Sequence, residues 1–367
     1  MTRAAVLERP GVPSRIEDLE LAKPGPGEVR VRMLASGVCH SDLHVRDGEW
    51  DRPGPVVMGH EGAGVVDALG DGVDGLAIGQ RVALAWLVPC GACRQCRSGH
   101  PWACPDSPSF RHRMVDGATR WRRPGGEDVL TYCAIGTLAE AEIVPAPAAI
   151  PIPDGVDPAA AALIGCCVAT GVGAVTKTAQ VPAGSSVAVI GLGGVGLSCV
   201  MGAALAGAGT IVAIDRVPSK LEAATSVGAT ATILATDDVA TLQQLRDLTD
   251  GGPDFVFEAI GRTETIDLAI AALPVGGAAV LVGMPPFGVG ASFEVYPFVD
   301  GSRRILGSNY GFADPAVDFA RYAQLHLEGR LPFDRLVDRR IGLDDLEDAF
   351  DAMRQGRFTR QVVVFDG

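Results

Sequence analysis

The sequence predicts an α/β fold in which a strand-rich, irregular first domain precedes a doubly wound parallel sheet. Short β-type runs punctuated by Gly and Pro fill residues 1 to about 150, whereas from about Pro158 apolar strands alternate with Ala-rich helical stretches. Alternation of this kind gives a parallel sheet with right-handed crossovers. Because 367 residues are too many for one compact core, we expect two domains.

The individual elements follow from the positions of the apolar runs. In the first region the start MTRAAVLERPG is typical of a short strand and a turn, and further strands are expected at Val29–Met33, Gly64–Ala68 and Arg81–Ala85. In the second region the expected strands are Val187–Ile190, Thr210–Ile214, Phe255–Glu258 and Ala278–Val282, and the expected helices between them are Leu197–Ala206, Lys220–Val227, Ala240–Leu248 and Thr263–Leu273. After about Gly311 we expect two amphipathic helices, Pro315–Glu328 and Leu343–Arg354, and a last strand, Gln361–Phe365.

Composition and charge exclude several classes of protein. A formal net charge of −13 and an aromatic content of 5% argue against a nucleic-acid partner, which needs clustered cations or stacking platforms. The chain start has no apolar signal-peptide core. The uncharged stretch Val187–Ile214 has the length of a membrane span, but its many glycines favour a buried strand–turn–helix–strand. We expect a cytoplasmic protein without a membrane segment.

The nine cysteines favour metal binding over disulfides, because their number is odd and four of them are clustered. Cys90, Cys93, Cys96 and Cys104 follow one another at spacings that wrap a tetrahedral ion. Four thiolates leave no open coordination position, so the expected ion is a structural Zn²⁺ that ties down a loop. An iron–sulfur cluster uses the same ligands, but nothing nearby suggests a redox relay.

A glycine-rich turn after a predicted strand indicates a dinucleotide site. Ser186–Ile190 leads into the turn Gly191, Leu192, Gly193, Gly194, Val195 and Gly196, a helix follows, and the next strand ends at Asp215. In such a turn the helix N-terminus binds the pyrophosphate, and the acidic residue accepts the ribose hydroxyls. Asp215 therefore favours NAD over NADP, although Arg216 beside it could accept a 2′-phosphate.

Three further segments become informative together. They are GVCHSDLH, which contains Cys39, GHEGAG, which contains His60, and GCCVATG, which contains Cys166. With the four-cysteine segment and VIGLGGVG, in this order and spacing, they resemble the zinc-containing medium-chain alcohol dehydrogenases over essentially the whole chain. The resemblance implies a zinc-dependent oxidoreductase that interconverts an alcohol and an aldehyde or ketone, with NAD as the hydride carrier and two Zn²⁺ per chain.

The resemblance also implies domain boundaries and roles for single residues. A GroES-like catalytic domain would span 1–166 with the structural zinc lobe at 88–106, a Rossmann NAD-binding domain would span 167–310, and 311–367 would return to the catalytic domain. Cys39, His60 and Cys166 would hold the catalytic zinc, and Glu61 would take part transiently. Asp42 would orient His60. Ser41 would pass the alcohol proton, through the nicotinamide ribose hydroxyl, to His44.

Cofactor contacts outside the turn are implied in the same way. Thr170 would pack on the nicotinamide, Lys220 and Arg262 would flank the adenosine, Arg360 would bind the pyrophosphate, and Val282 would also contact the cofactor. His40 stands where several relatives have Arg, so the cofactor affinity is expected to be weaker and pH-dependent. Cys167 stands where Gly is common; a packed thiol is favoured over a competing ligand.

The substrate is the least determined feature. Ser41, Trp86, Leu87, Met284 and Tyr310 are expected to line a mainly apolar pocket, which suits a medium, bulky or aromatic primary alcohol. The Arg-rich segment Ser109–Ala134 either frames the substrate entrance or is a solvated loop; if it binds an anionic thiol carrier, oxidation of hydroxymethyl–thiol adducts is the alternative activity. A catalytically silent zinc- and NAD-binding protein, or a zinc-free reductase, would not need the full set of catalytic residues. Gly277–Gly283 and the following Pro285 and Pro286 resemble the edge through which relatives form homodimers or homotetramers.

Overall fold

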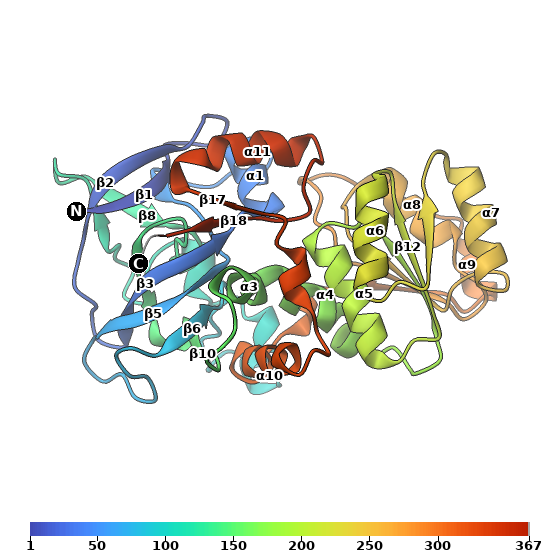
Figure 1. Ribbon diagram of the computed structural model, residues 1–367, viewed down its shortest axis with the longest axis horizontal. Coiled ribbons are helices and arrows are strands. Elements are labelled where there is room, and N and C mark those ends of the chain that lie inside the picture. Colours follow the sequence, from blue (N-terminus) through green and yellow to red (C-terminus); the bar gives the residue numbers. More distant parts are fainter. Residues whose placement is uncertain (366–367) are drawn as a thin grey trace. The chain divides into compact units, whose positions relative to one another are not determined.

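The computed structural model describes residues 1–365 and divides into two compact units (Figure 1). The first unit contains Met1–Cys166, Asp314–Glu328 and Val337–Gly367 as chain ranges, and the second contains Cys167–Ala313 and Gly329–Leu336. The division falls inside one helical stretch, Pro158–Thr178, between two adjacent cysteines.

The first unit is built on strands. Five short strands close a barrel in the order β1 (Thr2–Leu7), β2 (Arg15–Leu21), β7 (Trp121–Arg122), β8 (Asp128–Thr131) and β4 (Val56–Val57). A second sheet runs in the order β10 (Ala149–Pro151), β6 (Arg81–Leu84), β5 (Gly62–Leu69), β3 (Glu28–Gly37), β18 (Gln361–Val364) and β17 (Arg339–Ile341), and β9 (Ala141–Pro145) also pairs with β3. The predicted strand-rich texture of this region is therefore confirmed.

Strand β3 organises this sheet because one of its faces is continuously apolar. Val29, Val31 and Met33 alternate along the strand and are buried, as the two-residue period of a half-buried strand requires. They pack in one core cluster with residues of β5 and β6, among them Val66 and Leu84. The helices of this unit are α1 (His40–Arg46), α2 (Arg94–Arg97), α3 (Pro158–Leu163), α10 (Pro315–Leu327) and α11 (Leu346–Arg354).

The second unit contains the predicted parallel sheet. Its order is β13 (Ala231–Leu234), β12 (Thr210–Asp215), β11 (Ser186–Ile190), β14 (Phe255–Glu258), β15 (Ala278–Leu281) and β16 (Arg304–Gly307), and every neighbouring pair is parallel. The helices are α4 (Ala169–Gly173), α5 (Gly194–Ala206), α6 (Pro218–Ser226), α7 (Asp238–Leu248), α8 (Thr263–Ala271) and α9 (Val295–Asp300). The chain winds outward from β11 to β13 and then returns to β14, which creates a switch point between β11 and β14.

The expected elements of this unit agree with the structure apart from their ends, but strands β13 and β16 and helices α4 and α9 have no counterpart among them. Helix α5 starts at Gly194, three residues before the expected start, because the glycine-rich turn itself forms the first helical turn. Strands β13 and β16 were not expected. Both are edge strands with partly exposed side chains, so neither has the continuous apolar run that marks β11, β12 or β14.

The stretch Val187–Ile214 is the strand–turn–helix–strand that its glycines indicated, since it forms β11, α5 and β12. Within residues 1–365 a different segment, Pro158–Thr178, is the only helix long and apolar enough to cross a membrane. Of its most apolar window, 89% is buried inside the protein. A buried core helix passes the same test, so this segment is weak evidence for a membrane span.

Candidate active site

Cys39, His60, Glu61 and Cys166 lie together in the first unit, although three different segments supply them. One ligand atom from each residue can be chosen so that all of these atoms lie within 4.8 Å of one another. All four residues are buried, and Cys166, the most accessible, is 9% exposed. Cys39 stands at the N-terminus of α1, the His60–Glu61 pair immediately precedes β5, and Cys166 lies in the helical stretch that follows α3.

The donor set suits a zinc ion. Two thiols, one imidazole and one carboxylate are the ligand types that Zn²⁺ binds, and zinc sites of the catalytic kind use three protein ligands and keep one position open. Oxygen Oε2 of Glu61 is buried and has no hydrogen-bond partner in the described structure. A buried carboxylate oxygen without a partner is costly unless a cation faces it, so this atom supports a metal in the cluster.

The protonation states of the clustered residues depend on one another. A hydrogen bond from the Cys166 thiol lowers the pKa of Cys39 well below its ordinary value, so Cys39 is held as a thiolate. Burial opposes charging of His60, but the negative charges of Asp42 and Cys39 raise its pKa well above the ordinary value. Donation of the hydrogen bond to Cys39, together with burial, raises the pKa of Cys166 well above its ordinary value. Binding of a cation by both thiols and the imidazole would therefore release the protons that Cys166 and His60 hold.

Asp42 and Arg360 hold residues of this cluster in place through hydrogen bonds. Asp42 lies in α1 and is fully buried; its Oδ1 is 3.0 Å from Nδ1 of His60, and its Oδ2 accepts the backbone N–H of Cys39 at 3.3 Å. Arg360 donates to the Val38 carbonyl at 2.9 Å and to Oε1 of Glu61. Burial raises the pKa of Glu61 to about 7, and the Arg360 charge opposes that rise.

Ser41 and His44, the expected proton path, both lie in α1 one helical turn apart. His40, expected to contact the cofactor, begins the same helix and is exposed; its ring centroid is 5.4 Å from that of His44. Two aromatic residues near these groups have no sequence signature of their own. Tyr132 meets the His60 ring edge-on at 5.9 Å, and Trp50 stacks on His44 at 4.8 Å.

The four clustered cysteines form a second donor set in the first unit. Their sulfurs all lie within 4.8 Å of one another, with Cys90 to Cys96 at 4.0 Å and Cys93 to Cys104 at 3.9 Å. A tetrahedral ion with Zn–S bonds of about 2.3 Å needs sulfurs about 3.8 Å apart. Backbone N–H groups point at these sulfurs; those of Ala92 and Cys93 lower the pKa of Cys90 to about 7. The spacing of the four sulfurs therefore fits one tetrahedral zinc ion.

The dinucleotide turn lies at the switch point of the second unit. Gly191 follows β11 with a φ of 90°, and Gly193 is the N-cap of α5. A Cβ on Gly196 would lie 1.7 Å from the Gly191 carbonyl oxygen, so only glycine lets the helix pack this close to the turn. The oxygens of Asp215 accept the N–H groups of Leu192 at 2.8 Å and Val217 at 3.0 Å, which fixes the carboxylate at the end of β12.

The other expected cofactor residues lie in both units. In the second unit Thr170 and Val282 are buried, Lys220 is half-buried, and Arg216 and Arg262 are exposed, with Arg262 as the N-cap of α8. Of the residues expected to line the substrate pocket, Leu87 and Tyr310 are buried, whereas Met284 is 58% exposed.

The Arg-rich segment is largely committed to ion pairs inside the first unit. Arg120 pairs with Glu28 and Asp116, both at 2.7 Å. Arg122 pairs with Asp128, and Arg123 pairs with Glu8, Glu17 and Glu127. The segment is not a solvated loop, because it contributes β7 and β8 to the barrel and three of its five arginines are paired with carboxylates.

Comparisons with known proteins agree with this geometry. Residues 25–154 match the family model of the alcohol dehydrogenase GroES-like domain, and residues 194–325 match that of the zinc-binding dehydrogenases. The chain is 33% identical to an NDMA-dependent alcohol dehydrogenase of Amycolatopsis methanolica, over 99% of this chain and 98% of that protein. It is 35% identical to an S-(hydroxymethyl)glutathione dehydrogenase of Synechocystis sp. (strain ATCC 27184 / PCC 6803 / Kazusa), over 99% and 100%.

Solved structures share the fold of the whole chain. An alcohol dehydrogenase zinc-binding domain protein from Burkholderia ambifaria superposes with a TM-score of 0.95 at 36% identity, and benzyl alcohol dehydrogenase from Acinetobacter calcoaceticus with 0.93 at 31%. A structure from Sinorhizobium meliloti 1021, described as a zinc-binding dehydrogenase bound to NADP, gives 0.83 at 30%. Each comparison covers 100% of this chain and 99% of the other.

Proposed function

Because this chain belongs to the zinc-containing medium-chain alcohol dehydrogenases and is a zinc-dependent alcohol oxidoreductase, we propose that it transfers hydride reversibly between NAD and a medium, bulky or aromatic primary alcohol. The observation that carries the proposal is the buried cluster of Cys39, His60, Glu61 and Cys166, whose donor atoms lie within 4.8 Å of one another. The similarity to benzyl alcohol dehydrogenase, at 31% identity, supports an aromatic primary alcohol.

Cys39, His60 and Cys166 are the proposed ligands of the catalytic zinc. When bound, zinc supplies a Lewis acid that makes the alcohol more acidic, and the nicotinamide supplies the hydride acceptor. Asp42 orients His60 and fixes its Nδ1–H, which leaves Nε2 as the metal-binding nitrogen. Glu61, held by Arg360, is close enough to the donor atoms to exchange as a transient ligand.

Ser41 and His44 are the proposed path of the alcohol proton. The Ser41 hydroxyl can accept a proton and donate its own, and a ring nitrogen of His44 can accept that proton and pass it on to solvent. The His44 side chain is 17% exposed, so solvent reaches part of it. Both residues lie in the helix that Cys39 and Asp42 anchor to the metal cluster.

The proposed cofactor is NAD, and the proposed metal content is two Zn²⁺ per chain. Asp215 is fixed by two backbone N–H groups and would repel a 2′-phosphate, which supports NAD even though one structural relative holds NADP. The remaining cofactor contacts proposed above, from His40, Thr170, Val282, Lys220, Arg262 and Arg360, follow the family resemblance. The Cys90–Cys104 lobe would hold the second zinc and stabilise its loop.

Oxidation of S-hydroxymethyl adducts is the second candidate, favoured by the 35% identity to an S-(hydroxymethyl)glutathione dehydrogenase. An anionic thiol carrier needs free cations, and the arginines of the 109–134 segment that could serve are mostly paired with carboxylates. We therefore rank the simple alcohol first. Formaldehyde oxidation measured with and without a low-molecular-weight thiol separates the two.

We further propose a homodimer or homotetramer in the cytoplasm. Segment 284–299 of the second unit exposes a run of apolar side chains, which a second copy would cover: Met284, Phe287, Val289, Phe293, Val295, Tyr296 and Val299. The odd number of cysteines and the cluster of four favour metal binding over disulfides, which supports a reducing compartment. Light scattering on the purified protein would give the oligomeric state.

A panel of alcohols tests the proposed function. Benzyl alcohol, a long-chain primary alcohol, ethanol and a secondary alcohol are oxidised with NAD and with NADP, and the reduced nicotinamide is followed by absorbance. The proposal expects the highest kcat/KM for benzyl alcohol with NAD and two zinc ions per chain. A preference for NADP would overturn the role of Asp215, and thiol-dependent formaldehyde oxidation as the only activity would establish the second candidate.

A further inference from the structure

Helix α1 ends in a turn that brings residue 49 back over residue 44. Gly48 has a φ of 81°, its N–H donates to the Val45 carbonyl at 3.1 Å, and the Glu49 N–H donates to the His44 carbonyl at 2.9 Å. These two bonds define a Schellman motif, in which the second residue beyond the helix end lies against the third residue from its end. That contact is usually apolar. Here the two residues are Glu49 and His44.

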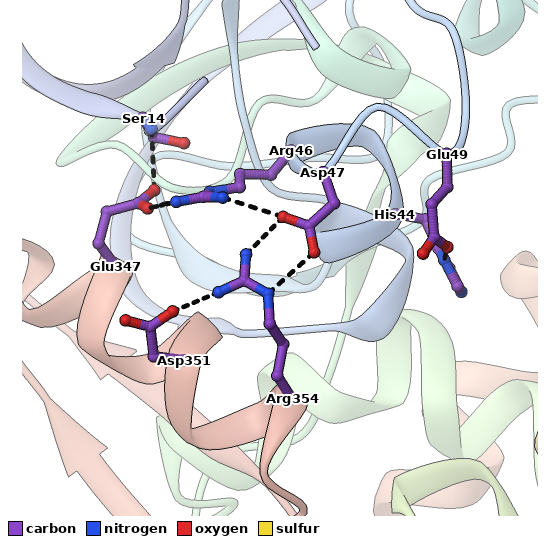
Figure 2. A network of polar contacts seen from close by, with 8 residues as sticks. All are labelled: Ser14, His44, Arg46, Asp47, Glu49, Glu347, Asp351 and Arg354. Atoms are coloured by element: carbon purple, nitrogen blue, oxygen red, sulfur yellow. Dashed lines mark hydrogen bonds and ion pairs between the residues drawn. The ribbon is translucent and has the colours of Figure 1, made fainter. Parts of the chain in front are cut away.

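The turn places a carboxylate on one ring nitrogen of His44. The Glu49 carboxylate is hydrogen-bonded to Nδ1 of His44, and Figure 2 shows the two side chains directly beside each other. The Trp50 ring stacks on the imidazole with ring centroids 4.8 Å apart and an interplanar angle of 26°. The backbone N–H of Trp50 donates to the His44 carbonyl at 3.2 Å. The imidazole is therefore held in its plane by Trp50 and along one edge by Glu49.

We propose that Glu49 is a positioning residue for proton transfer, which holds His44 as the Nδ1–H tautomer and so leaves Nε2 as the nitrogen that accepts the proton. An ionised carboxylate can only accept hydrogen bonds, so the hydrogen must lie on Nδ1. A base oriented by a carboxylate on its other nitrogen is the arrangement by which imidazole bases are fixed in hydrolytic triads. This inference rests on the proposed function, which assigns His44 the outer end of the proton path.

The separate ion-pair network at the end of α1 leaves Glu49 available for this role. Arg46 pairs with Asp47 at 3.0 Å and with Glu347 at 2.6 Å, and Arg354 of α11 pairs with Asp47 (Figure 2). This network fixes the helix without Glu49. In the described part of the chain, the Glu49 carboxylate has His44 as its hydrogen-bonding partner and no second cation.

The test is a double-mutant cycle in the zinc-loaded enzyme. Steady-state kcat for benzyl alcohol and NAD is measured for wild type, Glu49→Ala, Glu49→Gln, His44→Gln and the combination of Glu49→Ala with His44→Gln. We expect Glu49→Ala to lower kcat about tenfold with KM little changed. Glu49→Gln should recover part of this loss, because its amide oxygen still accepts a hydrogen bond from Nδ1 of His44. In the His44→Gln background, Glu49→Ala should have no further effect on kcat. Asp51→Asn, which removes an exposed carboxylate two residues away, is the matched control and should leave kcat unchanged.

A second measurement does not depend on turnover. Ring ¹⁵N shifts of selectively labelled histidines report the tautomer; His44 should be protonated on Nδ1 in wild type and should lose that preference in Glu49→Ala. An Nε2–H tautomer in wild type, or an equal fall in kcat with and without His44, would overturn the inference. If His44→Gln itself leaves kcat unchanged, the proton path of the proposed function is wrong, whereas the tautomer measurement still decides the role of Glu49.

Discussion

The carboxylate of Asp42 lies 3.0 Å from Nδ1 of His60. Both residues are buried: Asp42 is 0% exposed and His60 is 3% exposed. A buried carboxylate on the far nitrogen of a metal-binding imidazole fixes its tautomer and increases its basicity. The contact between Asp42 and His60 should therefore increase the affinity of the cluster for zinc.

Asp42→Ala should weaken zinc binding at the Cys39–His60–Cys166 cluster by about 10- to 100-fold, and Asp42→Asn should weaken it less, because an amide oxygen still accepts from Nδ1. Competition with a chromophoric chelator measures the affinity of the more weakly bound zinc. The zinc of the cysteine lobe is the internal control. An unchanged affinity in Asp42→Ala would mean that His60 needs no orienting partner.

Cys96→Ser should remove one zinc per chain and lower the midpoint of thermal unfolding by at least about 5 °C, because the lobe has little apolar core of its own and depends on the ion. Metal analysis and calorimetry check both effects. Ser98→Ala, in the same lobe, should change neither. Full zinc content in Cys96→Ser would show that the four thiols do not form one site.

Asp47 and Arg354 connect α1 to α11, and their coupling should be measurable but modest (Figure 2). A double-mutant cycle of Asp47→Asn and Arg354→Ala in unfolding free energy should give about 0.5–1 kcal/mol, because both side chains are partly exposed. The coupling should shrink in about 1 M salt, where charges are screened within about 3 Å. A coupling near zero at low salt would mean that packing alone holds the helix end.

The stability of the first unit should fall below neutral pH through His112. Burial, with a smaller effect of the Arg52 charge, lowers the pKa of His112 to about 4, and its Nδ1 accepts the Cys133 N–H at 3.1 Å. A lowered histidine pKa contributes stability that is complete above the unfolded value of about 6.5 and is lost as the pH falls toward 4. The loss from this residue between pH 7.5 and pH 5 should be about 2 kcal/mol.

His112→Asn is the variant that isolates this effect. His112 has a φ of 55°, a conformation that Asn tolerates, and the Asn amide oxygen can accept the same N–H without titrating. Chemical denaturation of both proteins at pH 7.5 and pH 5 should show a shallower pH dependence in the variant. Equal slopes would contradict a buried neutral imidazole.

Much of the fold could be predicted because the central strands of the second unit have an unmistakable pattern. Strands β11, β12 and β14 are continuous apolar runs, as strands covered on both faces must be. Strands β13 and β16 lie at the edges and have no such pattern, and the two-residue strands β4 and β7 of the barrel are too short to have any.

The candidate site also has a part that the sequence alone predicts and a part that it does not. The lobe of Cys90, Cys93, Cys96 and Cys104 is local, so its spacing alone predicts a metal site. Cys39, His60 and Cys166 come from distant segments, and only the family resemblance grouped them before the structure did. The contact between Glu49 and His44 has one local sequence feature, Gly48 two residues after Arg46, where α1 ends, but its significance depends on a side-chain contact that sequence does not specify.

Turnover should depend on a single zinc ion held by Cys39, His60 and Cys166. The most direct measurement is selective removal of the more weakly bound zinc with a chelator, followed by stepwise zinc addition while benzyl alcohol oxidation and bound zinc are measured together. Activity should disappear with the loss of one equivalent, while the cysteine-lobe zinc is retained, and should return in proportion to that equivalent. Full activity in protein that lacks this ion would contradict the proposed chemistry.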